Sequence, residues 1–505
     1  HEHADHLSGF VQKGSPFLQG AFSIDELWLA WTEKDGDRQA DALRKKRGTA
    51  RRVIAKAVQQ ARARNALGLA QRIAQLNEFD QPADDSTDLD AIRALHNRFA
   101  DDPDRAEACS RLAGALELLE GSNGAGDGLG AAEGAKPKPS SNELALGLLM
   151  ALAKDTKFVA PGETLTLDGV DLRAFVLGPP RDDAYLKRDQ PSKLPNQGEG
   201  HGHGKYNEVY LSGAGANQTF ELSPTLGLDE LPHHLSEMVR FPFDPAHQRR
   251  FQQSEDGTIR WETGKRDVPP DIQSFFQDRY FSATDAYRRI DTEWLASAEK
   301  LALNLDGDTN NTSLVLAFEW GKPAKGPILL FPGDAQVGNW LSWRQSLSAS
   351  DGSSGKPSAD DLMRRTLIYK VGHHGSHNAT VRRDPGQRDA AHPLGVPFGL
   401  ELMDDIIALI PVDREAAQRK MPIKWDMPYL ALYRRLREKA RNRVLRSDDG
   451  RDPLGPEEKD DLKPHKTTWT KVPGAKVVSW RKAEAQFTAG LSNALYFDLG
   501  LALSD

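Results

Sequence analysis

The chain has 505 residues, enough for about three domain-sized units and a large buried core. With 38% hydrophobic residues and a net charge of −7, its composition is that of a soluble chain, for which we expect a cytoplasmic location. No apolar run approaches the roughly 20 residues of a membrane-spanning helix, and the single cysteine, Cys109, excludes a disulfide scaffold. The first residue is His1 rather than Met, which we interpret as a natural start further upstream.

The first third of the chain is predicted to be mainly helical. Residues 1–31 are expected to form a loop followed by a short ordered segment. Apolar residues at helical spacing predict a long helix over 38–80 and a pair of helices over 88–120. The Gly-, Ala- and Ser-rich residues 121–141 are typical of a flexible linker, and a further helix is expected over 142–154.

After residue 161 the pattern changes to that of strands. Asp168-Gly169 between two apolar runs predicts a hairpin over 164–177, while 178–300 is expected to be irregular with helical pieces after 271. A helix is predicted over 426–443, and strands over 313–318, 328–331, 367–371, 406–410, 476–480 and 494–501. Strands alternating with helices favour a layered α/β core interrupted by a helical insert.

The chain opens with three histidines and an aspartate in the pattern H-x-H-x-D-H, from His1 to His6. Imidazole and carboxylate groups together suit zinc, with manganese or iron also compatible. At this spacing His1 and His3 could reach one ion, while Asp5 and His6 turn toward a second. The alternative is a solvated terminal loop or the remnant of a purification tag, although such a tag would be a continuous run of histidines.

Two predicted strands end in further potential ligands. The apolar run 328–331 leads into Gly333-Asp334, and the run 367–371 leads into His373-His374. Each feature has a plain alternative, since Gly-Asp is common in turns and paired histidines are common in surface loops.

In combination these motifs resemble the metallo-β-lactamase superfamily, and most closely the hydrolase domain of ComEC-type competence proteins. The similarity consists of H-x-H-x-D-H at 1–6, N-x-S-L-V-L at 311–316, G-D at 333–334 and H-H-G-S at 373–376, in the family's order. It implies an α/β fold of the αββα sandwich type. The family's strands before the first motif are not found here, so the upstream part of the core is expected to be missing.

The resemblance also implies a site with two divalent metal ions, zinc before manganese. Asp334 would bridge the ions, and His1, His3, Asp5 and His6 would bind them. Either His373 or His374 would complete the second ion's ligands, a choice that the sequence leaves open. Asp5 and Asp334 would be the catalytic carboxylates, with a hydroxide held between the metals as the nucleophile. The family often has one more histidine ligand between these motifs. The spacing does not select it among the candidates His201, His203, His233, His234 and His247.

Substrate contacts are predicted at Ser376 and Asn378, with turn capping as the alternative. The expected reaction is hydrolysis of an ester or phosphodiester bond, nucleic acid included. One alternative substrate is a small ester, thioester or lactam. The other alternative is a binding or scaffold module with a residual metal site. Basic residues gather over 44–64 and 434–443, where they could contact phosphates or simply pair with acidic neighbours.

The predicted domains follow from this order of motifs. Residues 1–31 would start the metallo-β-lactamase core, and 156–505 would supply its remainder, including the long loop 178–300 and a C-terminal extension. The segment 32–155, with the linker 121–141, would be a helical insert that could dock a protein partner. No membrane segment is expected in this chain.

Overall fold

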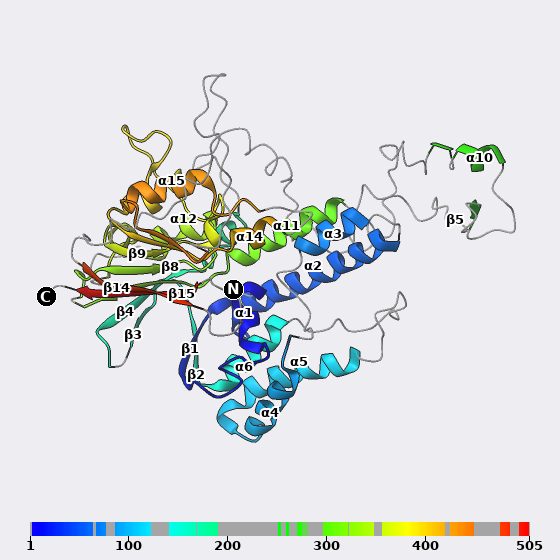
Figure 1. Cartoon of the computed structure of the whole chain (residues 1–505), viewed down its shortest axis with the longest axis horizontal. Coiled ribbons are helices and arrows are strands. Elements are labelled where there is room, and N and C mark those ends of the chain that lie inside the picture. Colours follow the sequence, from blue (N-terminus) through cyan, green and yellow to red (C-terminus); the bar gives the residue numbers. More distant parts are fainter. Residues whose placement is uncertain are drawn as a thin grey trace. The chain divides into compact units, whose positions relative to one another are not determined.

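The structure is a computed structural model of the whole chain, drawn in Figure 1. The residues whose structure is described are 3–63, 67–76, 86–122, 141–167, 169–189, 251–253, 259–261, 270–275, 278–279, 296–321, 323–347, 356–419, 425–448, 475–484 and 494–503. Among them, no helix combines the length and the apolar character needed to cross a membrane.

The chain divides into two compact units, which are described separately. The first contains residues 1–44, 79–221 and 306–505, and the second contains 45–78 and 222–305. Every residue of the candidate site discussed below belongs to the first unit.

A mixed sheet of seven strands forms the centre of the first unit. The first four strands in spatial order are parallel, and the remaining three alternate in direction. In that order the strands are β13 (Val444–Arg446), β12 (Ile407–Ile410), β9 (Thr366–Lys370), β8 (Ile328–Phe331), β7 (Val315–Trp320), β4 (Leu172–Gly178) and β3 (Thr164–Thr166). Because β8, β9 and β12 are parallel neighbours, their carboxyl ends meet at one edge.

One face of this sheet packs against helices (Figure 1). Trp340 and Trp343 stack at a ring distance of 4.0 Å, and Trp340 meets the ring of Tyr369 in β9 edge-on. These fully buried aromatic rings anchor the helical layer to the sheet. The helices and short turns around the sheet are α7 (Asp183–Leu186), α12 (Val337–Ser346), α13 (Ala359–Arg364), η9 (His373–Gly375), η10 (Gly399–Leu402), α14 (Arg414–Arg419) and α15 (Leu430–Lys439).

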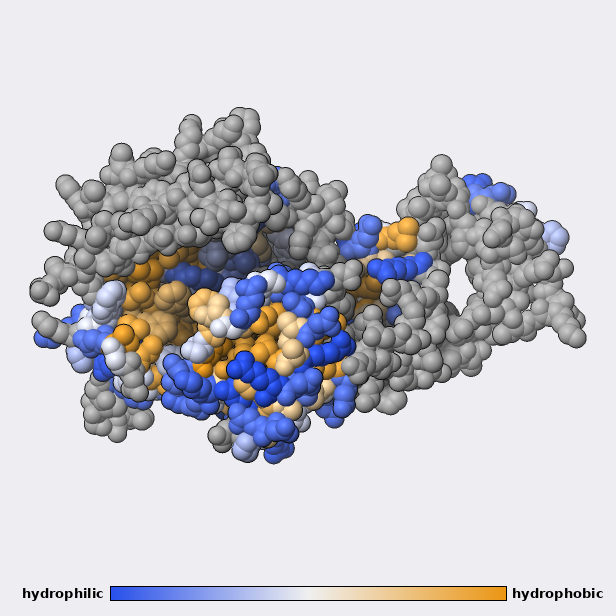
Figure 2. Space-filling view, turned by 60° about the horizontal axis from the view of Figure 1, so that its bottom comes forward, coloured by the Kyte–Doolittle hydropathy of each residue, from blue (hydrophilic) through white to orange (hydrophobic). Residues whose placement is uncertain are grey.

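The other face of the sheet is also apolar. Side chains alternate along a strand, so Leu316, Phe318, Leu329 and Phe331 lie opposite the core residues of β7 and β8. Phe331 is 38% exposed, and its ring lies 5.7 Å from that of Phe318. Figure 2 shows hydrophobic areas between hydrophilic ones on the face of the molecule that it presents.

The N-terminal part of the first unit is a helical layer with its own core. Ile92, Leu112, Leu144 and Val11 pack together within it. The contributing helices are α1 (Ala4–Val11), α4 (Leu89–Phe99), α5 (Ala106–Ser122) and α6 (Ser141–Leu152), beside the parallel pair β1 (Ile24–Ala30) and β2 (Ala153–Val159). The short helix η1 (Trp31–Glu33) follows β1, and η3 (Pro103–Arg105) lies between α4 and α5.

In the second unit, the buried side chains follow the spacing of a helix. Val53, Ile54, Ala57 and Ala61, predicted to share one side of a helix, are all buried. The boundaries between the two units fall within α2 (Arg38–Ala63) and α11 (Ala296–Asn310). The remaining elements of the unit are α3 (Leu67–Leu76), α10 (Pro270–Phe275), β5 (Phe251–Gln253) and β6 (Ile259–Trp261).

Two small antiparallel pairs of strands complete the first unit. They are β10 (Arg383–Asp384) with β11 (Val396–Pro397), and β14 (Ala475–Glu484) with β15 (Ala494–Leu503). The α/β class is confirmed, as are the hairpin at 164–177 and every predicted strand from 313 onward.

The prediction of a loop at the start of the chain was wrong, because residues 4–11 form α1. The helix predicted over 142–154 is confirmed as α6, which ends at Leu152, where the alternating segment Ala153–Val159 begins as β2. The helical pattern over 38–80 is also confirmed, and it contains two helices, α2 and α3. Most of the linker 121–141 and of the long loop 178–300 lies outside the described residues, as do the five histidines between His201 and His247.

A buried carboxylate in β7 connects several strands of the sheet. The side chain of Glu319 is fully buried and pairs with Arg173 of β4 and with Arg365, the residue before β9. Burial alone would raise the pKa of Glu319, but hydrogen bonds from the two arginines keep the pKa below its ordinary value of 4.5. Its stabilising effect is therefore present above about pH 4.5 and is lost as the pH falls through the lower, folded-state pKa.

We expect Glu319→Gln to lower the free energy of unfolding at pH 7 by about 3 kcal/mol, because two arginines lose a buried partner. The matched control is Glu401→Gln, whose carboxylate pairs with Arg435 nearer the surface and should contribute about 1 kcal/mol or less. Urea unfolding followed by circular dichroism measures both values. Equal losses in the two variants would contradict the assignment, as would a Glu319→Gln effect that does not shrink toward pH 3.

Candidate metal centre

The candidate site is built where two parallel strands end. Asp334 follows β8 after the turn Pro332-Gly333, and His373 and His374 follow β9 after Val371-Gly372. Gly333 has a φ of +59°, and a Cβ atom at this position would lie 3.0 Å from that of Ser313, so the close turn needs glycine. The strand order thus places one carboxylate and two imidazoles at the same edge of the sheet.

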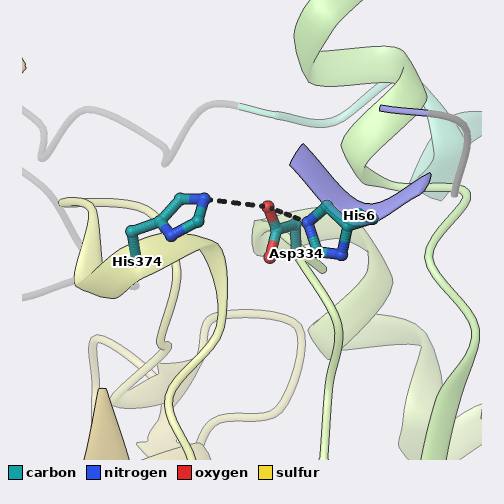
Figure 3. A group of neighbouring side chains, drawn as sticks. All are labelled: His6, Asp334 and His374. Carbon is teal, nitrogen blue, oxygen red and sulfur yellow. Dashed lines mark hydrogen bonds and ion pairs between the residues drawn. The ribbon is translucent and has the colours of Figure 1, made fainter. Parts of the chain in front are cut away.

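Three of the predicted ligands come together there (Figure 3). His6 Nε2 lies 3.0 Å from Asp334 Oδ2, and His374 Nε2 lies 3.8 Å from the same oxygen. One ligand atom from each residue lies within 4.8 Å of the other two. His6 is supplied by the first turn of α1, so a helix and two strand ends converge on this point.

The imidazole of His374 is oriented by the backbone of the next strand. Its Nδ1 lies 2.7 Å from the carbonyl oxygen of Pro411, which follows β12. A carbonyl only accepts hydrogen bonds, so Nδ1 of His374 carries a proton, and Nε2 is the nitrogen that faces Asp334 and could bind an ion. This is the arrangement in which a histidine can bind a metal ion.

The turn that carries the two histidines has an unusual backbone. His373 and His374 have φ angles of 42° and 52°, and Gly375 follows with 76°. A left-handed conformation costs a residue other than glycine about 1–3 kcal/mol and occurs mainly where function requires it. The turn is held in place by the N–H of Tyr429, which donates to the Gly375 carbonyl at 2.8 Å.

Asp334 is 1% exposed and is fixed by its surroundings. Its backbone N–H donates to Ser313 Oγ at 3.0 Å, and Asn311 Oδ1 accepts the N–H groups of Gln336 and Asn339 just after it. The Asn311–Leu316 motif therefore supports the Asp334 turn. Burial would raise the pKa of Asp334, but a hydrogen bond from His6 and the nearby histidines hold it well below its usual range. Asp334 is thus a carboxylate, the form that binds a cation.

The ring of His373 points elsewhere. Its Nδ1 lies 2.8 Å from Ser376 Oγ and 3.3 Å from Gln336 Nε2, and it is not part of the group of three ligands. The backbone N–H of His373 donates to Asp334 Oδ1 at 2.9 Å. Of the two histidines that the sequence left open, the structure therefore brings His374 to the site.

The two predicted substrate contacts are buried. Ser376 and Asn378 are each 4% exposed. Ser376 Oγ donates to Asn378 Oδ1, and Asn378 Nδ2 donates to the carbonyl of Asp189. In this structure both side chains stabilise the turn, while a role in substrate binding stays a prediction.

The other ligands of the first motif are placed differently. His3 is buried, and its Nε2 lies 3.7 Å from Asp306 Oδ1 in α11. Asp5 lies in α1, but its side chain is outside the described residues, as is the whole of His1. The sequence analysis did not identify Asp306. This residue precedes the Asn311 motif, but it is far from His3 in the sequence and no motif connects the two.

No protein-family model matches this chain, and neither does any curated protein or any solved structure. The assignment of the site therefore depends on its own geometry.

The residues fit a divalent cation. Two imidazole nitrogens and a buried carboxylate oxygen converge, and such a set is typical of zinc sites that keep a position open for water or substrate. His6, Asp334 and His374 would hold the ion.

We expect His374→Ala to weaken zinc binding by at least about 100-fold, because it removes a direct ligand and not only an orienting contact. The matched control is His392→Ala, since His392 is an exposed histidine that pairs with Asp389. Isothermal titration calorimetry of the metal-free protein measures both affinities. Unchanged zinc binding by folded His374→Ala would show that this group is not a metal site.

Proposed function

We propose that this protein is a metal-dependent hydrolase of ester or phosphodiester bonds. The observation that carries the proposal is the convergence of His6, Asp334 and His374 at the carboxyl ends of two parallel strands. A divalent ion bound there would polarise a carbonyl or phosphoryl oxygen and lower the pKa of a water molecule.

The contribution of the chain itself is to position His6, Asp334 and His374. The Pro411 carbonyl keeps the proton of His374 on Nδ1, and the Ser313 hydroxyl fixes the backbone of Asp334. The left-handed turn at His373-His374 aims one imidazole at the site and one backbone N–H at Asp334 Oδ1. These contacts set the positions of the ligands before any ion or substrate arrives, so neither has to order them.

The proposal includes the finer fold, an αββα sandwich of metallo-β-lactamase type. The seven-stranded sheet with helices on one face and a partly exposed apolar second face is compatible with it. A second sheet on that second face would complete such a sandwich. The helical segment 32–155 would then be an insert available to a protein partner.

Nucleic acid is the less favoured substrate class. In the second basic cluster, Arg435 pairs with Glu401 and Glu438, and Lys439 pairs with Asp404. Arg441 and Arg443 both pair with Asp405. Acidic neighbours therefore balance much of this cluster, which weakens its case as a phosphate-binding surface. The proposal favours a small ester or phosphodiester.

We expect Asp334→Asn to reduce hydrolysis of bis-p-nitrophenyl phosphate, or of a p-nitrophenyl ester, to the background rate, because the site loses its buried negative charge. The matched control is Asp389→Asn, the same change at an exposed loop position, which should leave the rate unchanged. Saturation curves with zinc and with manganese provide the measurement, with folding checked by circular dichroism.

Full activity in folded Asp334→Asn would contradict the mechanism. If the parent protein binds metal but hydrolyses no ester or phosphodiester, a binding or scaffold module becomes the better account.

A further inference from the structure

A lysine lies directly beside the candidate ligands. Lys370 is the last residue of β9, and its ammonium group lies 3.7 Å from Asp334 Oδ1. The same group donates to the Gly333 carbonyl at 3.3 Å, and the side chain is 22% exposed. Lys370, at the end of β9, thus contacts Gly333 and Asp334, which follow the end of β8.

The two oxygens of Asp334 consequently face different groups. Oδ2 faces the imidazole nitrogens of His6 and His374. Oδ1 faces the backbone N–H of His373 and the ammonium of Lys370. A carboxylate can bridge two metal ions through both oxygens or through one. Because Oδ1 already faces a hydrogen-bond donor and a positive charge, two ions would have to share Oδ2, where His6 and His374 would leave each ion with one imidazole.

We propose that the centre takes a single divalent ion, on Oδ2 together with His6 and His374, and that Lys370 occupies the place of a second cation. This inference rests on the proposed function and replaces the pair of ions expected from the sequence. Lys370 is a positioning residue, because its ammonium acts on Asp334 and holds Oδ1 away from a metal.

Electrostatics and the path of α1 favour this arrangement. A divalent ion on Oδ1 would have to displace the His373 N–H and lie next to the Lys370 ammonium, where like charges repel strongly because little solvent screens them. His3, which the sequence assigned to a different ion from His6, instead lies against Asp306. Within the described part of the chain, His6, Asp334 and His374 form a group of three potential ligands, and His3 is not part of this group.

The first experiment counts the ions. Metal-free full-length protein is titrated with Co²⁺, and binding is followed by visible absorption and calorimetry. We expect one tightly bound ion per chain in the parent protein and in His3→Ala, and none in His374→Ala. Two tightly bound ions in the parent, one of which is lost in His3→Ala, would overturn the inference while leaving a metal-dependent function intact. No tight binding in the parent would overturn the proposed function as well.

The second experiment tests the role of Lys370 through metal affinity. Lys370→Met removes the charge but keeps much of the side-chain volume, so the Co²⁺ affinity should rise by about tenfold or a second ion should bind, because repulsion is removed. Lys370→Arg keeps the charge and should behave like the parent. A folded Lys370→Met protein with unchanged or weaker Co²⁺ binding and one ion would mean that the lysine only stabilises the turn, and would overturn the proposal.

Discussion

The geometry of the site depends on one buried carboxylate at the end of β8. Asp334 is 1% exposed, yet it is ionised, because imidazoles, a backbone N–H and an ammonium surround it. A buried charge without such partners would be strongly destabilising, so α1, β8 and β9 must approach closely for the sheet edge to be stable. The close approach that stabilises this charge also brings the candidate ligands together.

The sequence predicted much of this arrangement from local pattern. Apolar runs followed by Gly333-Asp334 and Gly372-His373 indicated strands that deliver ligands at their ends, and the parallel order of β8 and β9 bears out that placement. The choice between His373 and His374 could not be predicted, because it depends on two left-handed residues and on the Pro411 carbonyl of another strand. Lys370 was missed because an ordinary strand lysine gives no signal until its neighbours are known.

The left-handed turn also shows how the site can be rigid without being large. A strained backbone persists only where surrounding contacts determine it, and here the Gly372, Gly375 and Tyr429 backbones supply them. The backbone of this turn therefore sets the direction of the His374 side chain, and the Pro411 carbonyl fixes its ring.

His6 and Asp334 are separated by 328 positions in the sequence. During synthesis, at about 5–20 residues per second, the N-terminal histidines would precede the completed sheet edge by roughly 15–65 s. In that interval they belong to a nascent segment whose partner carboxylate does not yet exist. Under the proposed function, selective metal uptake would begin only after β8 and β9 have been made and paired, so incorporation of the ion would be a late event in the biogenesis of the protein.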